Sequence, residues 1–179
     1  MLDLGSTTNI TKALIEKGAD VTVYPYNTSS AGLLKHDAIV LSEGPGNPKD
    51  VSQIFNNIKE LYNSNVPIFG IGLGHEIMAL SNNIDIEKLT HGHRGVNVPI
   101  KDLITEKVYI TSQNHSYGVV ESSIDKTIAT PIFVNINDGT IEGLKYVSKN
   151  ITTIQFGLNT DTEHILDEFL DSIKINEMA

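Results

Sequence analysis

A glycine-rich turn in the middle of the chain has the residue pattern of a site for nucleophilic chemistry. Pro67–Ile71 is a short apolar run, Gly72–Gly74 alternates glycine with leucine, and His75–Leu80 has apolar residues at helical spacing. A strand, a sharp turn and a helix form a nucleophile elbow, which holds one side chain at a helix N-terminus. The residue at the tip is Gly72, which adopts strained backbone angles freely but has no reactive side chain. The pattern therefore predicts the geometry of a nucleophilic site without its nucleophile.

Histidines and carboxylates nearby leave two other kinds of chemistry open. His91 and His93 form a His-x-His pair, which together with His115 is a familiar arrangement of zinc ligands. Alternatively, His75, His115 and Glu76 are candidates for an active amidotransferase or hydrolase with a non-standard residue set, because a histidine–carboxylate pair can activate water.

The composition narrows the class of protein. The 179 residues suit one domain, 1–179, and the net charge of −9 argues against nucleic acid or an anionic membrane as a partner. The sequence has neither an apolar run of transmembrane length nor the pattern of a signal peptide, so a cytoplasmic protein is expected. The absence of cysteine excludes disulfides, thiolate metal sites and a cysteine nucleophile.

The elements that position the elbow alternate in the first half of the chain. Strands are expected at 1–5, 21–24, 38–41 and 67–71, with helices at 7–17, 31–34 and 51–61 and from 75 onward. This alternation predicts an α/β fold with an open, mostly parallel sheet and helices on both faces. After Asn83 the pattern changes to short strands, expected at 97–100, 108–111, 117–120, 128–134, 140–147 and 151–156. They predict a smaller antiparallel region in the C-terminal half, closed by a helix over 162–173.

Five segments, in order, resemble class I (triad-type) glutamine amidotransferases, and most closely the glutaminase domain of the carbamoyl-phosphate synthetase small chain. Residues 70–76, Gly-Ile-Gly-Leu-Gly-His-Glu, are similar to the family's elbow Gly-Ile-Cys-Leu-Gly-His-Gln. Residues 41–48 resemble its oxyanion loop, Leu-Ser-Asn-Gly-Pro-Gly-Asp-Pro. Residues 91–99, 110–117 and 137–143 resemble its Gly-His-His-Gly-x-Asn-x-Pro, Gln-Asn-His-Gly-Phe and Asn-Asp-Gly-Thr-Leu-Glu-Gly segments. The resemblance covers essentially the whole chain and implies the family's flavodoxin-like sheet.

The family's catalytic triad has no counterpart at the matching positions. In the family a cysteine attacks the glutamine amide, a histidine relays protons and a glutamate orients the histidine. The matching residues are Gly72, Gly157 and Asn159, so the resemblance implies a pseudoenzyme. His164 lies seven residues beyond Gly157 and is expected to be an exposed helix residue rather than a displaced base.

The resemblance also implies a residual glutamine pocket without metal or cofactor. Its substrate-binding positions are Gly44, Gly46, Leu73, Glu76, Asn114, Ser116 and Tyr117. The segment around Asn114 either still offers a ligand-binding surface or now only packs. Glu76 replaces the family's glutamine, and as a carboxylate it is expected to repel the carboxylate of the substrate. The family places His91, His93 and His115 in structural or substrate-side roles, which implies that they bind no metal.

In the family, the small chain releases ammonia from glutamine for carbamoyl-phosphate synthesis, and so serves pyrimidine and arginine biosynthesis. The resemblance implies that this chain is a degenerate relative of that small chain. Without the triad, the chain is expected to be a scaffold or regulator of a synthetase. The expected partners are a carbamoyl-phosphate synthetase large subunit or a second copy of the chain. A sensor for a small amino-acid ligand is the alternative. The domain that precedes the glutaminase domain in true small chains is expected to be absent, which weakens the expectation of a synthetase partner.

Overall fold

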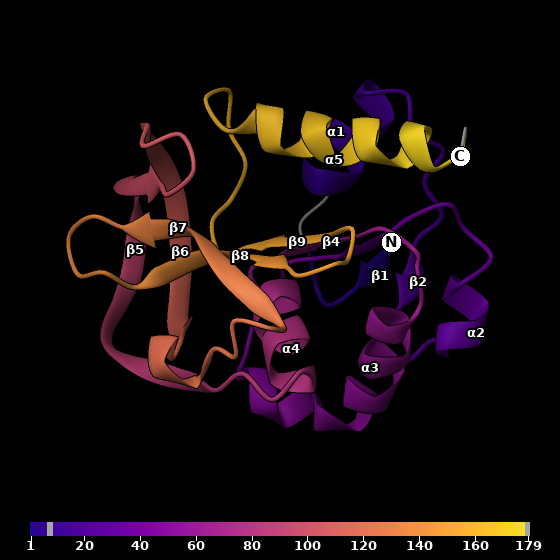
Figure 1. Cartoon of the computed structure of the whole chain (residues 1–179), viewed down its shortest axis with the longest axis horizontal. Coiled ribbons are helices and arrows are strands. Elements are labelled where there is room, and N and C mark those ends of the chain that lie inside the picture. The colour runs from indigo at the N-terminus through magenta and orange to yellow at the C-terminus, as the bar shows by residue number, and fades with distance from the viewer. Residues whose placement is uncertain (7–8, 178–179) are drawn as a thin grey trace.

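The first half of the computed structural model alternates strands with helices (Figure 1). The structure describes residues 1–6 and 9–177, and side chains as far as residue 173. The elements in order are β1 (Leu2–Asp3), α1 (Asn9–Glu16), β2 (Tyr24–Pro25), α2 (Ser30–Leu33), β3 (Ile39–Leu41), the 3₁₀ helix η1 (Pro48–Ile54), α3 (Phe55–Asn63), β4 (Ile68–Ile71) and α4 (Leu73–Ser81). The second half contains β5 (Ile86–Asp102), β6 (Val108–Val119), the 3₁₀ helix η2 (Glu121–Ser123), β7 (Ala129–Asn135), β8 (Ile141–Tyr146), β9 (Ile151–Ile154) and α5 (Glu163–Glu177).

Five strands form a parallel sheet that carries helices on both faces. Their order is β2-β1-β3-β4-β9, and each neighbouring pair is parallel. Helices α1 and α5 lie on one face, and α3 and α4 lie on the other (Figure 1). Every residue of β4 is buried, as expected of an apolar run in the middle of a parallel sheet. Phe69 of β4 stacks on Phe169 of α5, while Ile77 of α4 belongs to the core cluster on the opposite face.

The remaining four strands are antiparallel and close on themselves. The sheet continues from β9 through β8, β6, β5 and β7, and a further pairing of β7 with β8 closes a small barrel. The prediction of a fold that mixes helices and strands holds, but an open, mostly parallel sheet describes only β1, β2, β3, β4 and β9. The barrel stands beside α4, so the elbow lies between the two halves (Figure 1).

Several predicted element boundaries were wrong. Strand β5 runs without a break through the His91–Pro99 segment, where a strand was predicted only over 97–100, and β6 joins the strands predicted over 108–111 and 117–120. Two shifts in the β5–β6 register allow the long strands to continue through glycines that would otherwise interrupt them. The helix predicted over 51–61 is split, because Val51 has non-helical angles and the α-helix starts at Phe55. The predicted helix start at Thr7 lies outside the described residues.

The structure also bears on membrane insertion. Within the part of the chain that it describes, none of the helices is both long and apolar enough to cross a membrane.

Candidate functional site

The elbow has the predicted shape. Gly72 lies between β4 and α4 with φ 52° and ψ −112°, a conformation that an L-residue adopts only under strain. Its amide donates to the carbonyl of Ile154, and the Gly74 amide donates to the carbonyl of Ser42. These two bonds tie the turn to β9 on one side and to the 42–48 loop on the other. The tip is thus held in the geometry of a nucleophile elbow while carrying no side chain.

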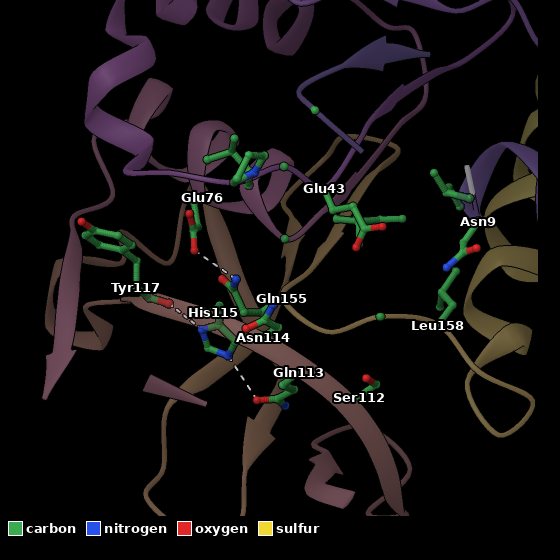
Figure 2. A pocket seen from close by; sticks show the side chains of 18 of the residues that line it. Asn9, Glu43, Glu76, Ser112, Gln113, Asn114, His115, Tyr117, Gln155 and Leu158 are labelled. Atoms are coloured by element: carbon green, nitrogen blue, oxygen red, sulfur yellow. Dashed lines mark hydrogen bonds between the residues drawn. The ribbon is translucent and has the colours of Figure 1, made fainter. Parts of the chain in front are cut away.

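A cavity of about 700 Å³ opens at this turn. Its lining includes all the predicted binding residues, namely Gly44, Gly46, Leu73, Glu76, Asn114, Ser116 and Tyr117, together with the former triad positions Gly72 and Gly157. The lining comes mainly from the 42–48 loop, the start of α4, the middle of β6 and the segment after β9, with further residues from α1, β5 and α5 (Figure 2). Segments that are distant in sequence therefore converge at the carboxyl ends of the parallel strands, where such sheets place their ligands.

The other two former triad positions, Gly157 and Asn159, differ in whether they line the cavity. A Cβ added at Gly157 would have the carbonyl oxygen of Ser112, at 3.6 Å, as its nearest neighbour, so a side chain has room there. Asn159 does not line the cavity. Its Nδ2 donates to the carbonyl of Ile110, and its Oδ1 accepts from the amides of Asp161 and Thr162. Asn159 thus stabilises the turn that leads into α5.

Glu76 is a buried acid on the wall of the cavity. Gln155 Nε2 donates to Glu76 Oε1 at 3.0 Å, and the two side chains point toward each other (Figure 2). Burial raises the pKa of Glu76 to about 8, against the opposing effect of the Gln155 hydrogen bond. At neutral pH the group is therefore mostly protonated, and the sequence-based expectation of a repelling carboxylate fails. A protonated carboxyl group has nearly the shape of the glutamine amide that it replaces.

The alternative catalytic set is not assembled at the cavity. His75 is fully buried, its Nδ1 pairs with Thr153 Oγ1, and it does not line the cavity. Burial lowers the pKa of His75 to about 3, so the ring is neutral and packed into the sheet. His164 also lies away from the cavity lining, where its ring packs against Tyr109. The geometry does not favour a hydrolase that uses His75 with His115 and Glu76.

Sequence reasoning missed several polar residues of the cavity, and three of them bear on its chemistry. Glu43, Arg94 and Gln155 line it, and Arg94 donates to Ser116 Oγ and to the carbonyl of His91. Arg94 is exposed, so its guanidinium is available for an anionic ligand group. Both Glu43 and Arg94 lie within family-like segments, so the motifs located them without indicating a role.

A cluster of histidines and carboxylates adjoins the cavity, because His115 belongs to the cluster and also lines the cavity. His93 Nδ1 lies 3.1 Å from His115 Nε2 and 3.1 Å from Glu142 Oε1, and His93 Nε2 lies 2.8 Å from Asp138 Oδ2. The hydrogen bond with Glu142 raises the pKa of His93 to about 9, aided by Asp138, whereas burial lowers the pKa of His115. The third histidine of the predicted group, His91, is exposed and does not join the cluster.

Comparisons with known proteins agree with this geometry. A sequence profile of the family Glutamine amidotransferase class-I matches residues 1–164. The chain is 40% identical to the carbamoyl phosphate synthase small chain of Oceanobacillus iheyensis, over 99% of this chain and 50% of that protein. It is 42% identical to the pyrimidine-specific small chain of Bacillus subtilis, over 99% of this chain and 50% of that protein. The chain thus spans about half the length of these relatives.

Solved structures show the same fold at low sequence identity. A protein of Thermoplasma acidophilum that is named as a GMP synthase component superposes with a TM-score of 0.88 at 19% identity, covering 99% of this chain and 94% of that one. A glutamine amidotransferase of Thermotoga maritima superposes with a TM-score of 0.68 at 16% identity, covering 99% and 81%. The elbow, the converging loops and the profile match lead to one conclusion: the chain belongs to the class I glutamine amidotransferase family.

Proposed function

We propose that this chain is a pseudoenzyme, a relative of the carbamoyl phosphate synthase small chain that does not hydrolyse glutamine and acts as a scaffold or regulator of a synthetase. The observation that carries the proposal is the elbow itself. It keeps the backbone angles of a nucleophile elbow and its cavity, but its tip is Gly72 and another former triad position is Gly157. Neither a nucleophile nor a base therefore reaches the cavity from these positions. A fold maintained without its chemistry fits a binding role.

The proposed partner is the large chain of a carbamoyl phosphate synthase, because the relatives at about 40% identity are small chains of that enzyme. The proposed setting is pyrimidine synthesis, after the pyrimidine-specific small chain of Bacillus subtilis. A cytoplasmic location and a role in arginine synthesis are proposed from the family resemblance alone. Self-association remains the alternative.

Mixing the purified chain with the large chain from the same organism tests the partner. We expect a stable complex on size-exclusion chromatography. In that complex, carbamoyl phosphate should form with free ammonia and not with glutamine, because the chain supplies no ammonia of its own. If the two proteins elute separately at micromolar concentrations, or if glutamine supports synthesis, the scaffold proposal fails.

A sensor of a small amino acid is the second candidate, and the size and polarity of the cavity favour it. Glutamine binding distinguishes the two. The lining carries the acidic side chains Glu43 and Glu163 and the guanidinium of Arg94, while Glu76 is mostly neutral at pH 7. The substrate's carboxylate therefore meets a net acidic environment with one guanidinium to offset it. We expect a dissociation constant weaker than about 1 mM at pH 7, which is the weak end of ordinary substrate binding.

Isothermal titration with glutamine measures this affinity. Binding should weaken further above pH 8, where Glu76 ionises, and the Glu76→Gln variant should not show this pH effect. Micromolar affinity in the unmodified protein would contradict the scaffold proposal and establish the sensor.

A further inference from the structure

Three side chains from three strands of the small barrel direct ligand atoms at one point. His93 and His115 are cross-strand partners in the β5–β6 register, and Glu142 lies on the neighbouring strand β8. A Cβ at Gly92, which has φ 63°, would lie 2.6 Å from the carbonyl oxygen of His115. Glycine at position 92 therefore permits the close approach of backbone that brings the two rings together. The sheet holds the cluster in place without help from a flexible loop.

The hydrogen bonds fix which ring nitrogen carries a proton. His115 Nδ1 lies 2.7 Å from the carbonyl oxygen of Tyr117, which can only accept, so the neutral ring keeps its lone pair on Nε2. His93 Nε2 faces the carboxylate of Asp138 at 2.8 Å, which directs the His93 Nδ1 atom inward. Metal-bound histidines usually donate their second N–H to a carboxylate or to a backbone carbonyl in this way. The two outer contacts thus orient both rings for ligation.

A metal ion would displace the proton that His93 Nδ1 shares with Glu142, and without that proton the inner side of the cluster has more acceptors than donors. His93 Nδ1, His115 Nε2 and Glu142 Oε1 converge there, and Gln113 Oε1 lies 3.1 Å from His115 Nε2. The Asn135 amide reaches Glu142 Oε1 only at 3.4 Å, which is too long for a strong hydrogen bond. Glu142 is fully buried, and its Oε2 has no hydrogen-bond partner in the described structure. A buried, unpaired carboxylate oxygen is costly unless a cation compensates it.

The spacing of His93 Nδ1, His115 Nε2 and Glu142 Oε1 matches a tetrahedral metal centre. They are separated by 3.1, 3.1 and 3.8 Å. A tetrahedral zinc ion with bonds of about 2.0–2.1 Å has its ligand atoms about 3.3 Å apart. A single point about 2.1 Å from all three atoms therefore exists just outside their plane, and it leaves a fourth position open.

We propose that His93, His115 and Glu142 form a binding site for a divalent metal ion of the zinc class, oriented by Asp138 and the Tyr117 carbonyl. This replaces the expectation, taken from the family resemblance, that these histidines bind no metal. The ion reaches the cluster from the Asp138 side, where the carboxylate is about half exposed. Bound there, it links β5, β6 and β8 and fixes the β6 segment that forms one wall of the cavity. The proposal does not depend on the proposed function.

The test is a titration of the chelator-treated protein with Co²⁺, followed by visible absorption, and with Zn²⁺, followed by calorimetry. We expect one equivalent of each metal to bind and the Co²⁺ complex to give the intense visible bands of a tetrahedral site. Glu142→Gln and His115→Ala should each weaken the affinity by at least about 100-fold. The control His91→Ala, an exposed histidine on the same strand, should bind as the unmodified protein does.

Because Glu142 is buried, its variant has to be shown folded by circular dichroism. The partly exposed Asp138 provides a variant that should fold normally, and Asp138→Asn should weaken binding by about 10- to 100-fold. The proposal is overturned if the unmodified protein binds no stoichiometric metal. It is equally overturned if Asp138→Asn leaves the affinity unchanged, or if His91→Ala reduces it as much as His115→Ala does. In those cases the cluster is a hydrogen-bonded ion pair that holds only a proton.

Discussion

The Gly72→Cys variant should release no more ammonia from glutamine than the unmodified protein, whereas Gly72→Cys/Gly157→His should exceed the single variant by at least about 100-fold. A triad works as a unit, so a thiol without a base gains little. A positioned general base contributes about 10²–10⁴-fold. The structure provides the room, because a Cβ at Gly157 meets no atom closer than 3.6 Å. At Gly72 a side chain takes the strained angles that are usual at an elbow.

The third former triad position can stay unchanged in this experiment. Asn159 stabilises the turn before α5, and replacing it risks a loss of about 0.5–2 kcal/mol, typical of a lost cap. Gly72→Ser/Gly157→His is the matched control, since it has the same shape and lacks the thiol. Glutamine turnover by the unmodified protein would refute the pseudoenzyme proposal. Full recovery by Gly72→Cys alone would contradict the argument that the thiol has no base.

The Glu76→Gln variant should be more stable than the unmodified protein at pH 8.5, by about 4–5 kcal/mol, because each unit of the pKa shift corresponds to 1.36 kcal/mol. Burial raises the pKa of Glu76 from 4.5 to about 8, so between these values the folded chain holds a proton that the unfolded chain releases. Stability contributed by the neutral group is complete below pH 4.5 and is lost as the pH rises through 8. A glutamine amide makes the same hydrogen bond to Gln155 and never ionises.

Urea unfolding at pH 5 and pH 8.5 measures this difference. The gain from Glu76→Gln should be small at pH 5, where Glu76 is neutral in the folded protein, and large at pH 8.5. Glu87→Gln, which removes an exposed acid, is the control and should change stability by less than about 0.5 kcal/mol at either pH. An equal gain at both pH values would mean that packing rather than ionisation is responsible.

The parallel half of the fold could be predicted from sequence because its signals are local. The apolar run at Ile68–Ile71 and the helical spacing after it identify a buried strand and a helix without reference to other parts of the chain. The barrel could not be predicted in the same way. Its strands contain glycine, proline and polar residues, and they pair through register shifts and a closing contact between β7 and β8. Pairings between segments that are distant in the chain leave little pattern in the local sequence of either strand.

In the candidate site, too, the features with a local sequence signal were predictable and those set by long-range contacts were not. The family motifs located many of the residues that line the cavity, because the elbow, the 41–48 segment and the 110–117 segment all contribute to its lining. The protonation of Glu76 was not predictable, because it depends on how deeply the side chain is buried. Glu142 was also missed, since it lies 49 residues from His93 and meets it only through the strand order.

Closure of the barrel also limits where a strand from another chain can pair with the sheet. Because β7 returns to β8, the described part of the chain leaves β2 as the one strand with a neighbour on a single side. That edge is two residues long, the Tyr24 amide is already bonded to Met1, and Pro25 has no amide hydrogen to donate. A short, proline-bearing edge is a poor template for adding a foreign strand. The protein is thereby protected against edge-to-edge aggregation, and two copies that associate must do so through side-chain surfaces rather than by extending the sheet.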